Sequence, residues 1–174
     1  MSEHTRQADV DQRSHAIQST RVATRRTYDD LVRVFASELG HLDPVVSGQL
    51  VERKAGWSEV ERAIEGMAGR HELMIIARVE LGGLISIRRQ ERRCSLYLVG
   101  NPEIASQIIA IDPRGSFYVP FRVALYDDGG PLRAMICYDR PSSFLATLGD
   151  PELTPIGELL DRKIDAVAAA VSAH

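Results

Sequence analysis

The run from Tyr138 to Ser143 holds the densest group of reactive side chains in the sequence, at the end of a predicted strand. It gathers a phenol, a carboxylate, a guanidinium and two hydroxyl groups at Tyr138, Asp139, Arg140, Ser142 and Ser143. Such groups predict a pocket for a polar ligand, or an enzyme in which Tyr138 and Asp139 act as acid and base on a substrate held by Arg140. A structural role is equally open, with an Asp139–Arg140 ion pair and a serine that caps the following turn.

A second candidate lies at Gly100-Asn101-Pro102, between a predicted strand and a predicted helix. Backbone N–H groups at a helix N-terminus attract anions, so Asn101 is a candidate ligand-binding residue. The spacing lacks the glycine pattern of a dinucleotide or phosphate loop. The alternative is that Asn101 only caps the helix while Pro102 occupies its first turn.

Nucleophilic, metal and redox chemistry is not indicated by the remaining residues. His41 and His71 sit at boundaries of predicted elements, and neither serine of the 138–143 segment lies in a nucleophile elbow. Cys94 and Cys137 are not in a CxxC pair and are interpreted as core residues on strands. The sequence therefore predicts no metal site and no cofactor, and leaves the identity of any catalytic residue unknown.

One dense basic run consists of Arg88, Arg89, Arg92 and Arg93. It is suited to a phosphate or carboxylate, but a charge run between strands is also typical of a solvated turn, and the sequence leaves both open. The formal net charge of the whole chain is -3, and aromatic residues are not interleaved with the arginines. We therefore expect neither nucleic acid nor a membrane as a partner.

Length and composition indicate one globular domain. The chain has 174 residues, of which 44% are hydrophobic, enough for a single core. Its unbroken apolar stretches are far shorter than a membrane span requires, and residues 1–18 carry neither an apolar signal core nor an apolar period. We expect a cytoplasmic protein with a flexible tail over residues 1–18 and one domain over residues 19–174.

The elements that must position these side chains follow from hydrophobic periodicity. Alternating or continuous apolar runs predict strands over residues 19–26, 73–81, 84–88, 94–99, 117–126 and 132–138. Periods typical of helices predict them over about 27–39, 44–51, 58–67, 102–111, 142–148 and 151–171. The two helices within about 41–70 are interpreted as an insertion. This order predicts an α+β fold with two layers, a largely antiparallel sheet and helices on one face.

Local signals mark where several of these elements begin and turn. Thr27 and Ser58 each precede an acidic residue at the spacing of a capping box, and Asp43 is the expected N-cap of the helix that starts at Pro44. Gly40 is expected in the left-handed conformation that ends a helix. Residues 127–130, Asp-Asp-Gly-Gly, predict a hairpin between the last two strands.

Four blocks in a fixed order resemble a known family, the domain of unknown function family 302. They are Tyr97-Leu98-Val99-Gly100-Asn101-Pro102, the segment 119–129 (Val-Pro-Phe-Arg-Val-Ala-Leu-Tyr-Asp-Asp-Gly), Tyr138-Asp139-Arg140-Pro141-Ser142-Ser143, and the terminal amphipathic helix. The resemblance covers roughly residue 19 to the C-terminus. Within the family, the sequence is similar to a longer subgroup that has extra helices before the second strand. Family members often have Asp-His before the glycine turn, where this sequence has Glu80-Leu81. The resemblance therefore does not imply, for this protein, any chemistry that depends on that histidine.

The resemblance implies a small two-layer α+β domain and a homodimer, and it implies no reaction. Three functions stay open on the sequence. The first is a homodimer that binds a small polar or anionic molecule, the second is a small enzyme of specialised metabolism, and the third is an interaction module without a ligand. The sequence does not identify a ligand, a substrate or a pathway.

Overall fold

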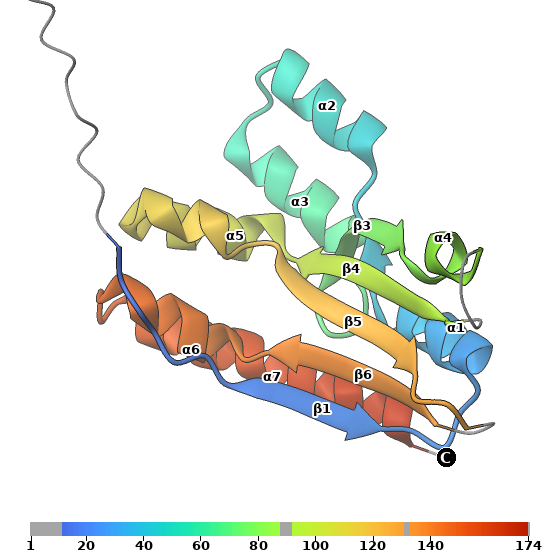
Figure 1. Cartoon of the computed structure of the whole chain (residues 1–174). Coiled ribbons are helices and arrows are strands. Elements are labelled where there is room, and N and C mark those ends of the chain that lie inside the picture. The colour runs from blue at the N-terminus through green and yellow to red at the C-terminus, as the bar shows by residue number, and fades with distance from the viewer. Residues whose placement is uncertain (1–11, 88–91, 131–132, 174) are drawn as a thin grey trace, which may run out of the picture.

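A single open sheet organises the computed structural model, which describes residues 12–87, 92–130 and 133–173 (Figure 1). The described strands lie in the order β1-β6-β5-β4-β3-β2, and every pairing is antiparallel except the short parallel pair of β2 and β3. The strands are β1 (Ser19–Ala23), β2 (Gly40–His41), β3 (Met74–Glu80), β4 (Cys94–Gly100), β5 (Phe121–Asp127) and β6 (Ala134–Asp139).

Helices cover one face of this sheet. In Figure 1, α1 and α7 run behind the strands, while the face toward the viewer carries no helix of the described part of the chain. The helical elements are α1 (Tyr28–Glu38), α2 (Pro44–Glu52), α3 (Trp57–Met67), α4 (Gly82–Ser86), α5 (Pro102–Ile111), η1 (Pro113–Phe117), α6 (Pro141–Leu145), η2 (Ala146–Leu148) and α7 (Leu153–Ser172). The expected α+β fold, with a largely antiparallel sheet, is confirmed.

The core lies between the sheet and α1 and α7, because alternate strand residues point to that side. Val123 and Leu125 of β5 and Ile136 of β6 are fully buried there against Leu31 of α1 and Ile164 of α7, and all of them belong to one hydrophobic cluster. Burial of these apolar side chains is the main stabilising contribution to the fold.

Several predicted signals are confirmed by the contacts they make. Thr27 accepts a hydrogen bond from the Asp30 backbone N–H, and Asp43 caps α2 by accepting from Val45 and Val46. The predicted hairpin joins β5 and β6, with Gly129 at a positive φ of 91°. That conformation is open to glycine at little cost.

The predicted strand over residues 84–88 is wrong, because residues 82–86 form the short helix α4. A short apolar run does not distinguish a strand from a helical segment, and here the pairing of β3 with β4 ends at Glu80 and Ser95. The Ser86 hydroxyl donates to the Gly82 carbonyl, which closes the helical turn. Part of the predicted strand, and the first two arginines of the basic run, lie outside the described residues.

Three predicted boundaries also differ from the structure. The strand expected from residue 117 begins at Phe121, because η1 occupies the preceding residues. Helix α3 begins at Trp57 after Gly56, without a side-chain cap, so Ser58 is not its N-cap. Gly40 continues into β2 and is not left-handed, since its backbone N–H bonds to the Leu73 carbonyl in a parallel bridge.

The described start of the chain already contacts the domain before β1. Gln18 donates its backbone N–H to the Ser143 hydroxyl, and its carbonyl accepts from the Arg140 N–H. Residues 1–11 of the expected flexible tail lie outside the described residues, so the tail stays a prediction. Within the described part of the chain, no helix is both long and apolar enough to cross a membrane.

Candidate functional site

A polar cavity of about 510 Å³ opens at one end of the sheet, between the start of α1, the end of β3 and α4. Its charged walls come from Arg78 and Glu80 of β3, Asp29 of α1, and Arg92 and Arg93 before β4. Cavities that bind small polar ligands place a few convergent polar groups in this way. We refer to the cavity lined by these residues as the anion cavity.

Strand pairing explains why polar side chains meet beside the core. Arg78 lies opposite Tyr97, and Glu80 opposite Ser95, in the antiparallel ladder of β3 and β4. Residues directly opposite each other point to the same face of a sheet. These four side chains therefore share the helix-covered side, where Tyr28 of α1 reaches them.

A chain of hydrogen bonds links these groups. The Ser95 hydroxyl donates to Glu80 Oε2 at 2.8 Å, and Arg78 Nη2 donates to the same oxygen at 2.7 Å. A hydroxyl has a single proton, so the Tyr28 hydroxyl is the donor in its contact with Ser95. Partial burial disfavours the charged Glu80, yet the bonds from Ser95 and Arg78 outweigh it and hold the pKa of Glu80 below its ordinary value.

One buried hydroxyl of this cluster lacks a partner. Tyr97 is 2% exposed, and its Oη makes no hydrogen bond within the described part of the chain. Burial raises the pKa of Tyr97, so its proton stays bound. The Arg78 guanidinium carbon lies 5.5 Å from the centre of the Tyr97 ring. An unsatisfied buried donor costs about 1–3 kcal/mol, and such groups are uncommon in native proteins.

The anion cavity carries more positive than negative groups. Three guanidinium groups face two carboxylates among the lining residues. Arg78 pairs with Glu80, and Arg93 pairs with Asp29 while its guanidinium carbon lies 4.7 Å over the Tyr28 ring. Arg92 is held through its backbone N–H, which donates to Ser86 Oγ at 2.9 Å, and its guanidinium makes no ion pair with a described residue. Among the described lining residues, one positive charge is therefore not balanced by a carboxylate.

The predicted residue Asn101 lies at the opposite end of β4, where its amide bonds to the backbone. Its Oδ1 accepts from the backbone N–H groups of Glu103 and Ile104, and its Nδ2 donates to the Glu72 carbonyl at 2.9 Å. These contacts give it the capping role that the sequence left open. They occupy its oxygen and one of its two amide N–H groups.

Tyr138, Arg140 and Ser142 of the predicted pocket point instead into a network with α7. The Tyr138 hydroxyl donates to Asp165 Oδ1 at 2.7 Å, and Arg140 bonds to both Asp165 and Asp161. The Ser142 hydroxyl donates to Asp161 Oδ2 at 2.6 Å. Burial, followed by the bond to Asp165, raises the pKa of Tyr138 well above its ordinary value.

The other two predicted residues lie elsewhere. Asp139 follows Tyr138 on β6, so its side chain points to the opposite face, where it accepts from the Ser19 hydroxyl and lies 3.7 Å from Arg122. Ser143 donates to the Arg140 carbonyl. Asn101 and Asp139 line different cavities, with Phe121 in the wall of both. This geometry does not bring Tyr138 and Asp139 to one substrate.

Sequence reasoning missed the residues that bond to Tyr138, Arg140 and Ser142, and it missed the polar cluster beside the anion cavity. Asp161 and Asp165 are spaced i, i+4 on the terminal helix, which puts two carboxylates on one side of it. Arg78-x-Glu80 carried a similar signal, since polar residues at alternate positions of an otherwise apolar strand share a face.

Cys94 and Cys137 are free and half-buried on the face opposite α1 and α7, rather than in the core. The described residues hold no group of three potential metal ligands.

The chain has an α+β fold with an open, largely antiparallel sheet, and known proteins share this class of fold. One solved structure, the crystal structure of an uncharacterized conserved protein DUF302 from Bacillus stearothermophilus, has a TM-score of 0.61. It is 10% identical in sequence, and the match covers 88% of this chain and 97% of that chain. No curated protein matches. Residues 49–171 match the model of the family described as Domain of unknown function DUF302, so the chain belongs to that family.

Proposed function

We propose that this protein binds a small anionic molecule, a carboxylate or a phosphate, in the anion cavity. The observation that carries the proposal is the excess of guanidinium groups over carboxylates there, with Arg92 free of any ion pair to a described residue. A planar guanidinium suits the two oxygens of such a group. The proposal keeps the ligand class expected from the sequence and moves the site away from Asn101 and the 138–143 segment.

Local support comes from how firmly the cavity walls are held. Arg93 is fixed between Asp29 and the Tyr28 ring, and Arg78 between Glu80 and the Tyr97 ring. Side chains that are already ordered lose little conformational entropy when a ligand binds. The cavity therefore offers preorganised positive charge with one exposed cation at its rim.

The test is calorimetric titration of the purified chain with inorganic phosphate and with succinate at low salt. Arg92→Gln is expected to weaken binding of one of these anions by about fivefold, in line with ~1 kcal/mol for an exposed charge pair. Arg162→Gln is the matched control, because Arg162 is exposed on α7 and lines none of the cavities described here. Equal affinity of the two variants, or no binding of either anion, would refute the proposal.

We also propose that the chain forms a homodimer through the face of the sheet opposite α1 and α7. That face carries Val79, Leu96, Ala124, Tyr126, Met135 and Cys137, which the strand registers place side by side. Val79 is 47% exposed. An interface between identical copies must complement itself, and the apolar centre of this face can do so while Arg21, Arg122 and Asp139 lie beside it on the same face. A cytoplasmic location stays a prediction from the sequence.

Light scattering tests the dimer at micromolar concentrations. Leu96→Glu places a charge at the centre of the proposed interface and is expected to give monomers. Ile109→Glu changes an apolar residue on α5 that is 40% exposed, away from that face, and should leave the dimer intact. A wild-type monomer, or dissociation by both substitutions, would count against the proposed interface.

A further inference from the structure

We propose a second binding site, for a small amphiphile with a carboxylate head and an unbranched aliphatic chain, in the cleft between the α2–α3 pair and the end of β4. This site is distinct from the anion cavity, which lies at the other end of β4. Two adjoining cavities form the cleft, an inner one beside the sheet and an outer one beside the helices. Together they have the apolar lining that an aliphatic chain requires.

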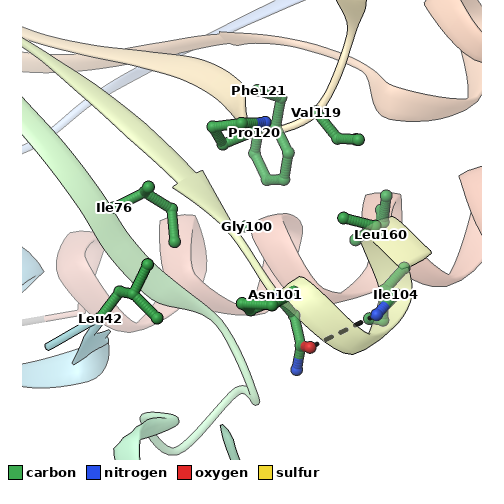
Figure 2. Close-up of a pocket in the computed structure, with 11 residues that line it drawn as sticks. Leu42, Ile76, Gly100, Asn101, Ile104, Val119, Pro120, Phe121 and Leu160 are labelled. Carbon is green, nitrogen blue, oxygen red and sulfur yellow. Dashed lines mark hydrogen bonds between the residues drawn. The ribbon is translucent and has the colours of Figure 1, made fainter. Parts of the chain in front are cut away.

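The inner cavity has a volume of about 200 Å³ and an apolar lining (Figure 2). Leu42, Ile76, Phe121 and Leu160 surround it, and Figure 2 shows their side chains around a common space. A bulge interrupts the pairing of β3 with β4 at Ile76, and bulges redirect side chains in this way. The one polar side chain in the wall belongs to Asn101, whose oxygen accepts two hydrogen bonds and whose nitrogen donates one to the backbone.

An apolar cavity of this kind favours an apolar occupant. Ordered water needs two to four polar partners, which the lining does not offer. Transfer of a methylene group from water to such a place contributes about 0.8 kcal/mol. The inner cavity is thus suited to the end of a hydrocarbon chain and not to a polar metabolite.

The outer cavity lies beside α2 and α3 and adjoins the inner one. It has a volume of about 330 Å³ and shares Leu42 and Pro102 with the inner cavity. Val51 and Trp57 in its wall are 77% and 51% exposed, which is high for large apolar side chains. A chain lying across both cavities would cover these side chains. Because the two cavities adjoin at Leu42 and Pro102, a flexible linear chain suits them better than a rigid ring system.

Lys54 gives this apolar cleft a single charged group. It lies between α2 and α3, lines the outer cavity and makes no ion pair within the described part of the chain. Its backbone is fixed at a φ of 50°, with the N–H groups of Lys54 and Ala55 bonded to the carbonyls of Val51 and Leu50. An ammonium group at the mouth of an apolar cleft complements a carboxylate head. This charge commits the proposal to an anionic amphiphile.

The test uses Trp57, the only tryptophan of the chain, as its reporter. Titration with decanoate, below the concentration at which it forms micelles, should shift the Trp57 emission to shorter wavelength in a saturable manner. Octanoate should bind about tenfold more weakly, because two methylene groups are lost. Butyrate should cause no shift.

Two variants separate the head from the chain. Lys54→Gln should weaken decanoate binding by up to about fivefold and leave binding of 1-decanol unchanged, because only the former needs the charge. Ala105→Phe should fill the inner cavity, which Ala105 lines, and abolish binding of both. The circular dichroism spectrum of Ala105→Phe must match that of the wild type. Should this variant not fold, the comparison of Lys54→Gln with 1-decanol decides the matter.

Three results would overturn the proposal. The first is a wild-type emission that does not saturate with decanoate. The second is equal loss of decanoate and decanol binding in Lys54→Gln. The third is an emission shift that follows protein concentration without ligand, which would show that a second copy of the chain covers the cleft. Because Arg92 lies at the far end of β4, Arg92→Gln should leave decanoate binding intact.

Discussion

Replacement of Asp161 by alanine tests whether the 138–143 segment serves stability rather than ligand binding. The side chain of Asp161 is 8% exposed and accepts from the backbone N–H of Ser142, from its hydroxyl and from Arg140. Removing it leaves the half-buried N–H and hydroxyl of Ser142 without a partner and takes one of two carboxylates from Arg140. We therefore expect a large loss of stability.

The magnitude follows from burial. Breaking a buried ion pair costs about 3–5 kcal/mol, because one charge remains unpaired. Arg140 is 30% exposed and keeps its bonds to Asp165, so the lower end applies and we expect about 3 kcal/mol. For a chain of this length that corresponds to a fall in Tm of roughly 6–12 °C.

Urea and thermal denaturation of the variant measure this loss. Glu158→Ala is the matched control, because Glu158 is exposed on the same helix. A loss for Asp161→Ala no larger than that for Glu158→Ala would refute the structural interpretation. It would also reopen the 138–143 segment as a binding site, since its polar atoms would then not depend on α7.

Three further predictions concern other parts of the domain. Tyr97→Phe should leave stability unchanged or raise it by up to about 1 kcal/mol, since the hydroxyl lacks a partner among the described atoms, whereas Tyr138→Phe should lower it by about 1 kcal/mol in urea denaturation. A result in the reverse order would contradict the hydrogen bonds described. Gly40→Ala should destabilise the chain strongly, because a Cβ there meets a backbone carbonyl, while Gly48→Ala, in open space on α2, should stabilise it by up to about 1 kcal/mol in thermal melts. Since the folded pKa of Glu80 is lowered, its contribution to stability is present above its ordinary pKa of 4.5 and is lost as the pH falls below that value. Glu80→Gln should therefore flatten the fall in stability on acidification, measured by urea denaturation from pH 6 to pH 3.

The sequence was sufficient for elements with strong local signals. The caps at Thr27 and Asp43 and the hairpin at Gly129 were predicted, and the cap at Asn101 was one of two roles left open, because each depends on contacts within a few residues. The segment that became α4 was predicted as a strand, since five residues are too few for a period to distinguish the two structures. The sequence thus predicts an element correctly where contacts within a few residues determine its structure.

The candidate sites depend on contacts between residues far apart in the sequence, which the sequence alone did not predict. Tyr138, Arg140 and Ser142 were expected to act together, and they do meet, but around two aspartates that follow about twenty residues later. The anion cavity depends equally on the register that sets Arg78 opposite Tyr97. Pairings at such separations are fixed by the packing of the whole sheet, and no local pattern encodes them.

The distribution of polar groups within the fold gives a reason to favour the anion cavity over the 138–143 segment. Around Asp161 the polar atoms satisfy one another, so the cluster gains nothing from a ligand. The Tyr97 hydroxyl, beside Arg78, has no partner in the described chain, and Arg92 in the wall of the anion cavity makes no ion pair with a described residue. Natural proteins retain such uncompensated groups where function requires them. The satisfied cluster therefore holds α7 against the sheet, and the unsatisfied one is where a ligand would contribute most.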